Sequence, residues 1–178
     1  MSQALFGPIV QIGHVVADLD AAVAGRIAGL GQGPWTVFRG SVLNSHYRGH
    51  PTQVTMDVAL AYQDGVQIEL IQQRGTDASP YIDTTGPKSG LHHVAWLVDD
   101  LDVALAAAKA RGLKPVFTAT SAAVRVAYLN SPVEPEILYE LIEGADMRAM
   151  IDAGIVATAD WDGTDAIMEI DMSGSGAA

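Results

Sequence analysis

The 178-residue sequence contains no cysteine. This absence excludes disulfide bonds, thiolate zinc sites and cysteine nucleophiles. Any metal site in the chain must therefore be built from nitrogen and oxygen ligands, which the side chains of His, Asp, Glu and Gln supply.

Positive charge is scarce: 10 Lys and Arg stand against 21 Asp and Glu, which gives a formal net charge of −11. Such a chain repels phosphate-rich surfaces, so neither nucleic acid nor an anionic membrane is an expected partner. No apolar run reaches the roughly 18 residues that a bilayer-spanning helix needs, and the first ten residues lack the basic start of a secretory signal. We therefore expect one globular domain in the cytoplasm.

An internal repeat organises the sequence. The segment QIGHVVADLDAAVAGRIAGLG (residues 11–31) aligns at a single offset with HVAWLVDDLDVALAAAKARGL (residues 93–113). In both copies Asp-Leu-Asp follows an apolar run, at residues 18–20 and 100–102. A repeat of this kind constrains the whole architecture, because each copy is one structural unit.

Each copy predicts one strand, one helix and three further strands. The first Asp of Asp-Leu-Asp is suited to cap a helix, and the Ala-rich segments 20–30 and 101–111 end near Gly31 and Gly112. Strand patterns follow in GPWTVFRG, TQVTMDVALAY and GVQIELIQQ, and again in LKPVFTAT, AVRVAYLN and EILYELIEG. We predict an α+β domain whose tandem βαβββ modules form a cupped, mostly antiparallel eight-stranded sheet around a shared cleft.

The predicted domain covers residues 1–178 in four parts. Module one spans residues 8–73, a linker rich in Gly, Pro, Thr and Asp spans 74–90, module two spans 91–143, and a C-terminal helix and tail span 144–178. Paired modules leave exposed sheet edges to cover, so we also expect a homodimer.

The repeat selects four polar residues for the cleft. Gln11 and His93 begin the two copies, and Glu69 and Glu140 lie within the apolar last strands, in QIELIQ and LYELIE. A carboxylate inside an apolar strand is costly unless it is paired, hydrogen-bonded or bound to a metal. Three oxygen donors and one imidazole suit Zn, Ni, Co, Mn or Fe(II). The neutral amide of Gln11 is either a ligand or only a hydrogen-bonding partner, and the sequence leaves both roles open.

These segments also carry a family resemblance. HVAWLVDDLDVALAAAKARG, QIELIQQ and LYELIE resemble the vicinal oxygen chelate superfamily, which includes glyoxalase I, methylmalonyl-CoA epimerase, extradiol dioxygenases and bleomycin-resistance proteins. The resemblance covers about residues 8–145, and GLHHVAWLVDD is most similar to the epimerases. It implies metal ligands at Gln11, Glu69, His93 and Glu140. Some glyoxalase I enzymes have this ligand set, whereas epimerases generally carry a histidine at the position of Gln11.

The resemblance implies a divalent-metal-dependent isomerase, epimerase or lyase that acts next to a carbonyl of a small-molecule substrate, without an organic cofactor. A metal there stabilises charge on the substrate oxygen, and Glu140 is the implied base, with Glu69 as the alternative. A non-catalytic protein that binds an antibiotic or aromatic ligand is a second interpretation. An extradiol dioxygenase fits less well, because its iron needs two histidines and one carboxylate.

Two further predictions concern individual side chains. Neighbouring strand residues point to opposite faces, and the repeat aligns His93 with Gln11, so His93 rather than His92 is the predicted ligand. The segment NSHYRGHP (residues 44–51) is interpreted as a long loop over the cleft, where substrate contacts are common. His46, Tyr47 and Arg48 are therefore candidate substrate-binding residues, although an ordinary polar surface loop explains the segment equally well.

Overall fold

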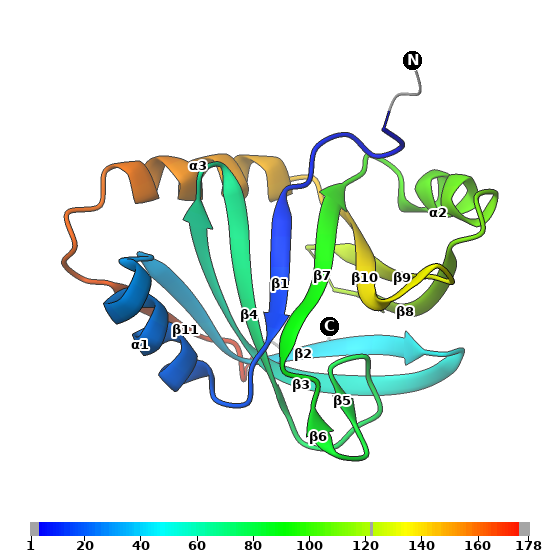
Figure 1. Ribbon diagram of the computed structural model, residues 1–178, viewed down its shortest axis with the longest axis horizontal. Helices are drawn as coiled ribbons and strands as arrows, with labels where there is room; N and C mark the ends of the chain where they lie inside the picture. Colours follow the sequence, from blue (N-terminus) through cyan, green and yellow to red (C-terminus); the bar gives the residue numbers. More distant parts are fainter. Residues whose placement is uncertain (1–3, 122, 175–178) are drawn as a thin grey trace.

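The computed structural model describes residues 4–121 and 123–174. Two βαβββ modules follow one another along the chain (Figure 1). The elements of the first module are β1 (Gln11–Val15), α1 (Leu19–Leu30), β2 (Trp35–Tyr47), β3 (His50–Gln63) and β4 (Val66–Arg74). Those of the second are β7 (Gly90–Leu97), α2 (Leu101–Lys109), β8 (Lys114–Thr120), β9 (Arg125–Ser131) and β10 (Glu134–Glu143). The short strands β5 (Ile82–Asp83) and β6 (Gly86–Pro87) lie between the modules, and α3 (Met147–Ala159) and β11 (Ile167–Asp171) come last.

The helix of each module begins as the repeat predicts. The side chain of Asp18 accepts a hydrogen bond from the Ala21 backbone N–H at 2.9 Å, and that of Asp100 accepts one from Val103 at 3.0 Å. Each carboxylate satisfies one of the free N–H groups at a helix N-terminus. Helix α1 ends at Gly31, whose φ of 61° is the left-handed conformation that glycine adopts without strain.

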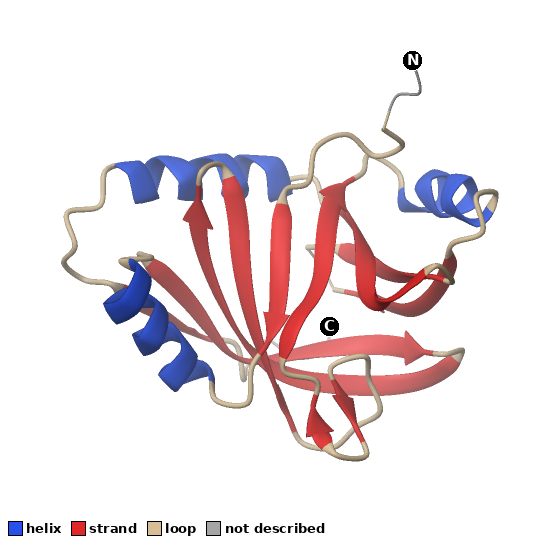
Figure 2. Cartoon of the chain, viewed as in Figure 1, coloured by secondary structure: helices blue, strands red, loops and turns tan. Residues whose placement is uncertain are grey.

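Within the described residues nine strands form one sheet, in the order β11-β2-β3-β4-β1-β7-β10-β9-β8, and Figure 2 shows how strongly it curls. In each module the last strand runs parallel to the first, and the other neighbours are antiparallel. The modules meet at the antiparallel pair β1–β7, and residues 44–47 of β2 also pair with β8. This second contact closes eight strands into a barrel. The predicted α+β fold with tandem βαβββ modules is confirmed, and the cleft is more enclosed than the sequence indicated.

The segment interpreted as a long loop is instead a β-hairpin. Strand β2 continues to Tyr47 and β3 begins at His50, so that only Arg48 and Gly49 form the turn. Both turn residues have positive φ, 52° and 84°, as the tight turns that match strand twist require. Arginine is uncommon in this conformation, which explains why the sequence does not reveal the turn. The uninterrupted strand is what allows β2 to reach β8.

Buried clusters lie on both faces of the curled sheet. Helices α1 and α2 pack on its outer face, where Leu19 and Leu101 belong to two separate clusters. A third cluster fills the barrel and includes the aromatic rings of Tyr81, Phe117 and Tyr128. A polar side chain that points into the barrel is therefore surrounded by apolar groups, and it must find a partner there.

The chain after module two adds a helix and a strand. Helix α3 packs on β3 and β4, and Gly154 lies so close to Tyr62 that an added Cβ would be 2.0 Å from the ring. Strand β11 runs parallel to the first part of β2. The C-terminal helix was expected, but β11 was not, because its residues are mostly exposed and show no buried alternation. No helix in the described parts of the chain has the length and apolar character that crossing a membrane requires.

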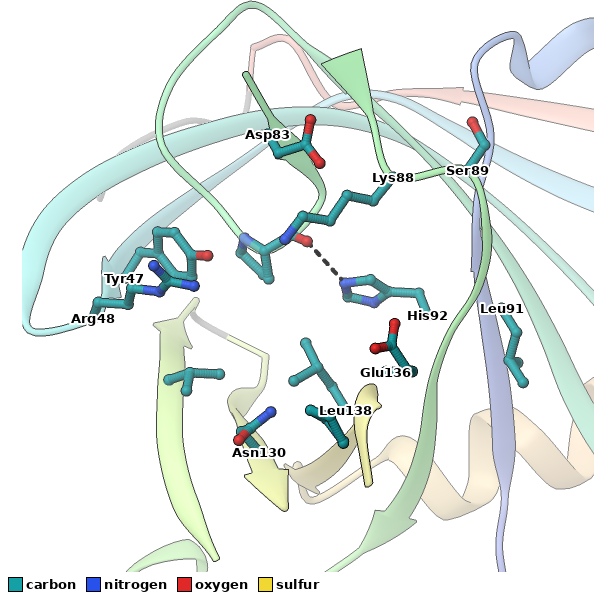
Figure 3. A pocket seen from close by; sticks show the side chains of 13 residues that line it. Tyr47, Arg48, Asp83, Lys88, Ser89, Leu91, His92, Asn130, Glu136 and Leu138 are labelled. Carbon is teal, nitrogen blue, oxygen red and sulfur yellow. Dashed lines mark hydrogen bonds between the residues drawn. The ribbon is translucent and has the colours of Figure 1, made fainter. Parts of the chain in front are cut away.

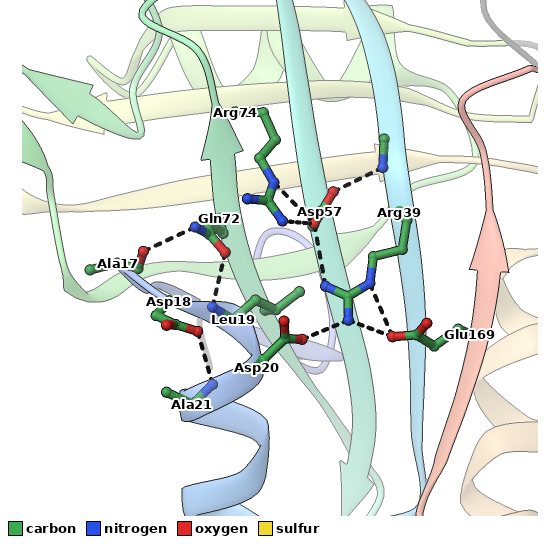
Figure 4. Close-up of polar contacts among 11 residues, drawn as sticks. Ala17, Asp18, Leu19, Asp20, Ala21, Arg39, Asp57, Gln72, Arg74 and Glu169 are labelled. Carbon is green, nitrogen blue, oxygen red and sulfur yellow. Dashed lines mark hydrogen bonds and ion pairs between the residues drawn. The ribbon is translucent and has the colours of Figure 1, made fainter.

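A charge network on the outer face joins β11 and the start of α1 to the strands β2, β3 and β4 (Figure 4). Asp57 of β3 is buried and accepts hydrogen bonds from Arg39 of β2, from Arg74 of β4 and from the Gly40 backbone. Arg39 also pairs with Glu169 of β11 and with a carboxylate at the start of α1. Burial raises the pKa of Asp57, but the bonds from Arg74 and Gly40 outweigh it and hold the pKa below its ordinary value. Asp57 is thus the anion that holds two arginines together.

We expect Asp57→Asn to lower the free energy of unfolding by about 3 kcal/mol, because it leaves two arginines facing each other without their shared anion. Urea unfolding followed by circular dichroism measures this loss. Asp20→Asn is the matched control, since the side chain of Asp20 is 73% exposed and an exposed ion pair contributes at most about 1 kcal/mol. Equal losses in the two variants would contradict a central role for Asp57.

Candidate metal centre

Four adjacent strands in the middle of the sheet, β4, β1, β7 and β10, meet where the two modules join. Each places one of the repeat-selected residues on the inner face: Glu69, Gln11, His93 and Glu140. Gly13 of β1 is the Cα partner of both Glu69 and His93, and Ala95 of β7 is the partner of both Gln11 and Glu140. The strand register therefore brings together four side chains that are far apart in the sequence.

The ring of His93 lies at the centre of this group. It is completely buried, and its Nε2 atom lies 3.1 Å from Gln11 Oε1, 3.2 Å from Glu69 Oε2 and 3.1 Å from Glu140 Oε2. One ligand atom from each of Glu69, His93 and Glu140 lies within 4.8 Å of the others. These three residues form a potential metal site, and the amide oxygen of Gln11 faces the same point.

The two carboxylates also have unused acceptor atoms. Among the described residues, Glu69 Oε2 and Glu140 Oε2 are buried and have no hydrogen-bond partner. A buried carboxylate oxygen without a donor is costly, and the ion pairs with His93 compensate only while that ring is protonated. Two carboxylates, one imidazole and one amide oxygen are a donor set that divalent first-row metals accept, so the residues present fit a metal.

The amide of Gln11 is oriented by hydrogen bonds behind it. Its nitrogen donates to Gln67 Oε1 at 2.7 Å, and the amide nitrogen of Gln67 donates to the Tyr62 hydroxyl at 2.8 Å. Because the nitrogen is engaged on that side, the oxygen of Gln11 is the atom directed at His93. The chain Gln11–Gln67–Tyr62 extends to helix α3, whose Gly154 lies against the Tyr62 ring.

Gly13 makes room for the ring of His93. A Cβ atom at Gly13 would lie 2.0 Å from His93 Cε1 and 2.2 Å from Nε2, closer than any real contact. The ring occupies the space that any other residue would fill, and the neighbouring strands hold it there. Glycine at position 13 is therefore a requirement of the site.

We expect Gly13→Ala to fold but to bind divalent metal at least about 10-fold more weakly, because the methyl group must push the imidazole away from the carboxylates. Isothermal titration calorimetry with Zn²⁺ or Ni²⁺ measures the change. Gly25→Ala is the matched control, since that helix position has open space for a Cβ. Wild-type metal affinity in Gly13→Ala would show that His93 is not a ligand.

His92 does not point away from His93 as strict alternation predicts. The β1–β7 register shifts between Gly13 and His14, where β7 contains one extra residue. This β-bulge breaks the alternation of side chains, so both rings are buried inside the barrel and their Nδ1 atoms lie 2.9 Å apart. The expectation of opposite faces is wrong, and the choice of His93 as ligand now depends on which ring faces the carboxylates.

The hydrogen bonds of the two rings define a tautomer for each. Nε2 of His92 lies 3.2 Å from the carbonyl oxygen of Pro80 and is the donor of that bond. Its Nδ1 is then the acceptor, and Nδ1–H of His93 donates to it. When the His93 ring is neutral, this assignment leaves the lone pair of Nε2 facing the carboxylates, and when the ring is protonated, Nε2–H points at the same oxygens. Such a partner behind a histidine ligand commonly orients it.

The pKa values of the two rings move in opposite directions. Burial lowers the pKa of His93, but the charges and hydrogen bonds of Glu140 and Glu69 outweigh it and raise the pKa to about 10. Burial, together with the nearby His93, lowers the pKa of His92 to about 3. Burial raises the pKa of Glu140, and His93 opposes that effect. At neutral pH a metal would have to displace a proton from His93.

Glu69 and Glu140 line a cavity of about 220 Å³ inside the barrel. Two buried tyrosines share it: Tyr81 and Tyr128, whose hydroxyl oxygens are 3.0 Å apart. Burial raises the pKa of both phenols well above its ordinary value, so both remain hydrogen-bond donors. Neither tyrosine was among the residues predicted from the sequence. Tyr81 lies in the linker, where a single aromatic residue among polar ones was the available signal.

The three residues selected from NSHYRGHP do not line this cavity. Tyr47 and Arg48 line a different one, of about 580 Å³, together with His92, Lys88 and acidic residues (Figure 3). The Arg48 guanidinium lies 5.1 Å from the centre of the Tyr47 ring. His46 is exposed on β2 and lines neither cavity. The hairpin explains this outcome, because it extends β2 along the barrel wall away from the carboxylates.

Residues 10–128 match the family model of the glyoxalase/bleomycin resistance protein/dioxygenase superfamily. The chain belongs to this superfamily. That result confirms the resemblance found in the sequence, since this group and the vicinal oxygen chelate superfamily are the same.

Solved structures of other proteins share the fold. Methylmalonyl-CoA epimerase from Mycobacterium tuberculosis is 21% identical, with a TM-score of 0.54, over 84% of this chain and 96% of the epimerase. A hypothetical protein from Bacillus halodurans C-125 is 20% identical, with a TM-score of 0.53, over 76% of this chain and 93% of the other. No curated protein matches the sequence. At these identities the likeness concerns the fold alone.

Proposed function

We propose that the protein is a divalent-metal-dependent isomerase, epimerase or lyase that acts on a carbon next to a carbonyl group of a small molecule. One observation carries this proposal: two buried carboxylates with unpaired oxygens flank His93 and open into a cavity. The membership in the superfamily supports the reaction class, and the donor set supports the metal.

The residues of the site would have different roles in the reaction. Gln11, Glu69, His93 and Glu140 would hold the metal, which would supply stabilisation of the negative charge that develops on the carbonyl oxygen. Glu69 and Glu140 approach His93 from the two modules, on β4 and β10. One carboxylate would remove a proton from the carbon, and the same or the opposite one would return it. The raised pKa of Glu140 suits it to be the base.

The cavity itself favours one further candidate function. Its tyrosines and aliphatic residues also suit a protein that binds an aromatic ligand without converting it. The iron of an extradiol dioxygenase would need a second histidine ligand. His92 does not supply it, because its two ring nitrogens are engaged with His93 and Pro80. We therefore propose catalysis first and sequestration second.

The test combines metal analysis with hydrogen exchange. Protein loaded with Zn²⁺, Ni²⁺ or Mn²⁺ should bind one ion per chain. In D₂O it should incorporate deuterium next to the carbonyl of at least one compound in a panel of α-hydroxy ketones, glutathione adducts and acyl-CoA thioesters. Exchange should stop when EDTA removes the metal. Tight ligand binding without exchange would favour sequestration, and a chain that binds no metal would contradict the proposal.

A further inference from the structure

We propose that the cavity beside Glu69 and Glu140 selects an uncharged carbonyl compound with a compact apolar body and rejects analogues that carry a carboxylate or phosphate. This inference rests on the proposed function and names the substrate class of the same site. It follows from three properties of the cavity: the character of its wall, its charge and its size.

The wall of the cavity is apolar. Leu43 of β2, Met56 and Val58 of β3, Ile71 of β4 and Val126 of β9 face it, so substituents of a bound molecule would contact hydrocarbon. The polar groups of the wall, apart from the two glutamates, are hydroxyls, among them those of Tyr81 and Tyr128. Hydroxyl groups can hydrogen-bond a neutral oxygen, but they cannot neutralise an anion.

The charge of the cavity disfavours anions. Among the described residues that line it, none is Lys, Arg or His, and the charged ones are Glu69 and Glu140. A divalent cation would be balanced by these two carboxylates, which leaves no positive charge for a substrate anion. An unpaired anion in apolar surroundings is costly, so an added carboxylate should weaken binding strongly.

The arginines of the barrel strands have other partners. Arg39 and Arg74 pair with Asp57 on the outer face, and Arg125 pairs with Asp102 and Glu143. Arg48 and Lys88 line the other cavity, beyond His92 (Figure 3). Recruiting one of them would require a change in the structure that surrounds it.

The size of the cavity limits the substrate. Its volume of about 220 Å³ lies below the range of about 300–1,000 Å³ that is typical of sites for drug-sized ligands. The part of the substrate that enters is therefore compact. A malonyl-type thioester, with a second carboxylate next to the reacting carbon, is disfavoured on grounds of charge.

The test uses metal-chelating probes that differ in charge and not in size. Benzohydroxamate binds a metal through two oxygens, and its 4-carbamoyl and 4-carboxy derivatives are an uncharged and an anionic molecule of equal size. With Zn²⁺-loaded wild-type protein, calorimetry should show that the 4-carbamoyl probe binds at least about 10-fold more tightly than the 4-carboxy probe. Equal affinities, tighter binding of the 4-carboxy probe, or failure of all three hydroxamates on metal-loaded protein would overturn the proposal.

A pair of variants tests the physical cause. Ser41 lines the cavity and is half-buried, so Ser41→Lys should add the missing cation, and Ser41→Gln should add similar length without charge. Ser41→Lys should reduce the preference for the uncharged probe at least about 5-fold relative to Ser41→Gln. An unchanged preference in a folded, metal-loaded Ser41→Lys protein would contradict the electrostatic explanation.

Failure of the proposed function is distinguishable from failure of this inference. If metal analysis finds no bound ion, the proposed chemistry is wrong. Charge selection is then measured with benzamide and benzoate, which need no metal. Preference for benzamide would support the apolar, anion-rejecting cavity, and equal binding or equal absence of binding would overturn it.

Discussion

Glu140→Gln should lower the rate of deuterium exchange into a carbonyl substrate by about 100-fold or more, the usual scale of acid–base catalysis. The amide has the size of the carboxylate and keeps one donor oxygen, but it cannot accept the proton. Glu140 is buried beside the cavity, and burial raises its pKa toward the range where a carboxylate is an effective base. Quenched-flow exchange analysed by mass spectrometry measures the rate.

Control variants show whether a loss of exchange is specific to Glu140. Glu136→Gln changes an exposed carboxylate of the same strand and should keep wild-type exchange. The Glu140→Gln protein should also retain its fold and a measurable metal affinity. If Glu69→Gln abolishes exchange and Glu140→Gln does not, the two glutamates have exchanged roles. If both variants remain active, the barrel interior is not where the reaction occurs.

His93→Ala should abolish stoichiometric binding of divalent metal. The imidazole Nε2 atom is within 3.2 Å of all three oxygen donors, and its removal leaves two carboxylates and an amide without a nitrogen ligand. His92→Ala should still bind one ion, about 10-fold more weakly, because it removes only the acceptor that orients His93. Calorimetry and elemental analysis of the dialysed proteins distinguish the two. The reverse ranking would identify His92 as the ligand.

The same measurement predicts a dependence on pH. Because Glu140 and Glu69 raise the pKa of His93 to about 10 in the metal-free protein, the ring is protonated at pH 7 and a metal must displace that proton. Metal affinity should therefore increase with pH up to about 10 and fall as the pH decreases. Titrations in buffers of different ionisation enthalpy should detect one proton released per ion in the wild-type protein, and release of no proton would contradict the displacement.

Some features of the site were predictable because they depend on local pattern. A carboxylate inside an apolar strand is visible without a structure, and Glu69 and Glu140 were found in that way. The internal repeat added His93 and Gln11, because both begin a copy at the equivalent position and were expected to share the cleft between the modules. The helix starts at Asp18 and Asp100 were predictable for the same reason, since capping involves residues only three positions apart.

Other features depend on the register between strands that are distant in the sequence. The bulge at His92 exists only in the pairing of β7 with β1, and it overturns the alternation on which the sequence argument relied. The Arg48–Gly49 turn sends Tyr47 and Arg48 along the barrel wall, away from the carboxylates that they were expected to accompany. The bulge has no signal within a single segment, and the local signal of the turn is weak because arginine is uncommon at positive φ.

The sequence by itself therefore determined the α+β class, the two βαβββ modules and the four polar residues at their junction, because periodicity, capping and burial cost operate within short segments. The tertiary structure alone decided that β2 meets β8, that Tyr81 from the linker enters the barrel, and that no Lys, Arg or His among the described residues lines the cavity. Those outcomes depend on contacts between segments that are distant in the sequence. Each segment contributes one or two side chains to them, and only the closed sheet places those side chains around one space.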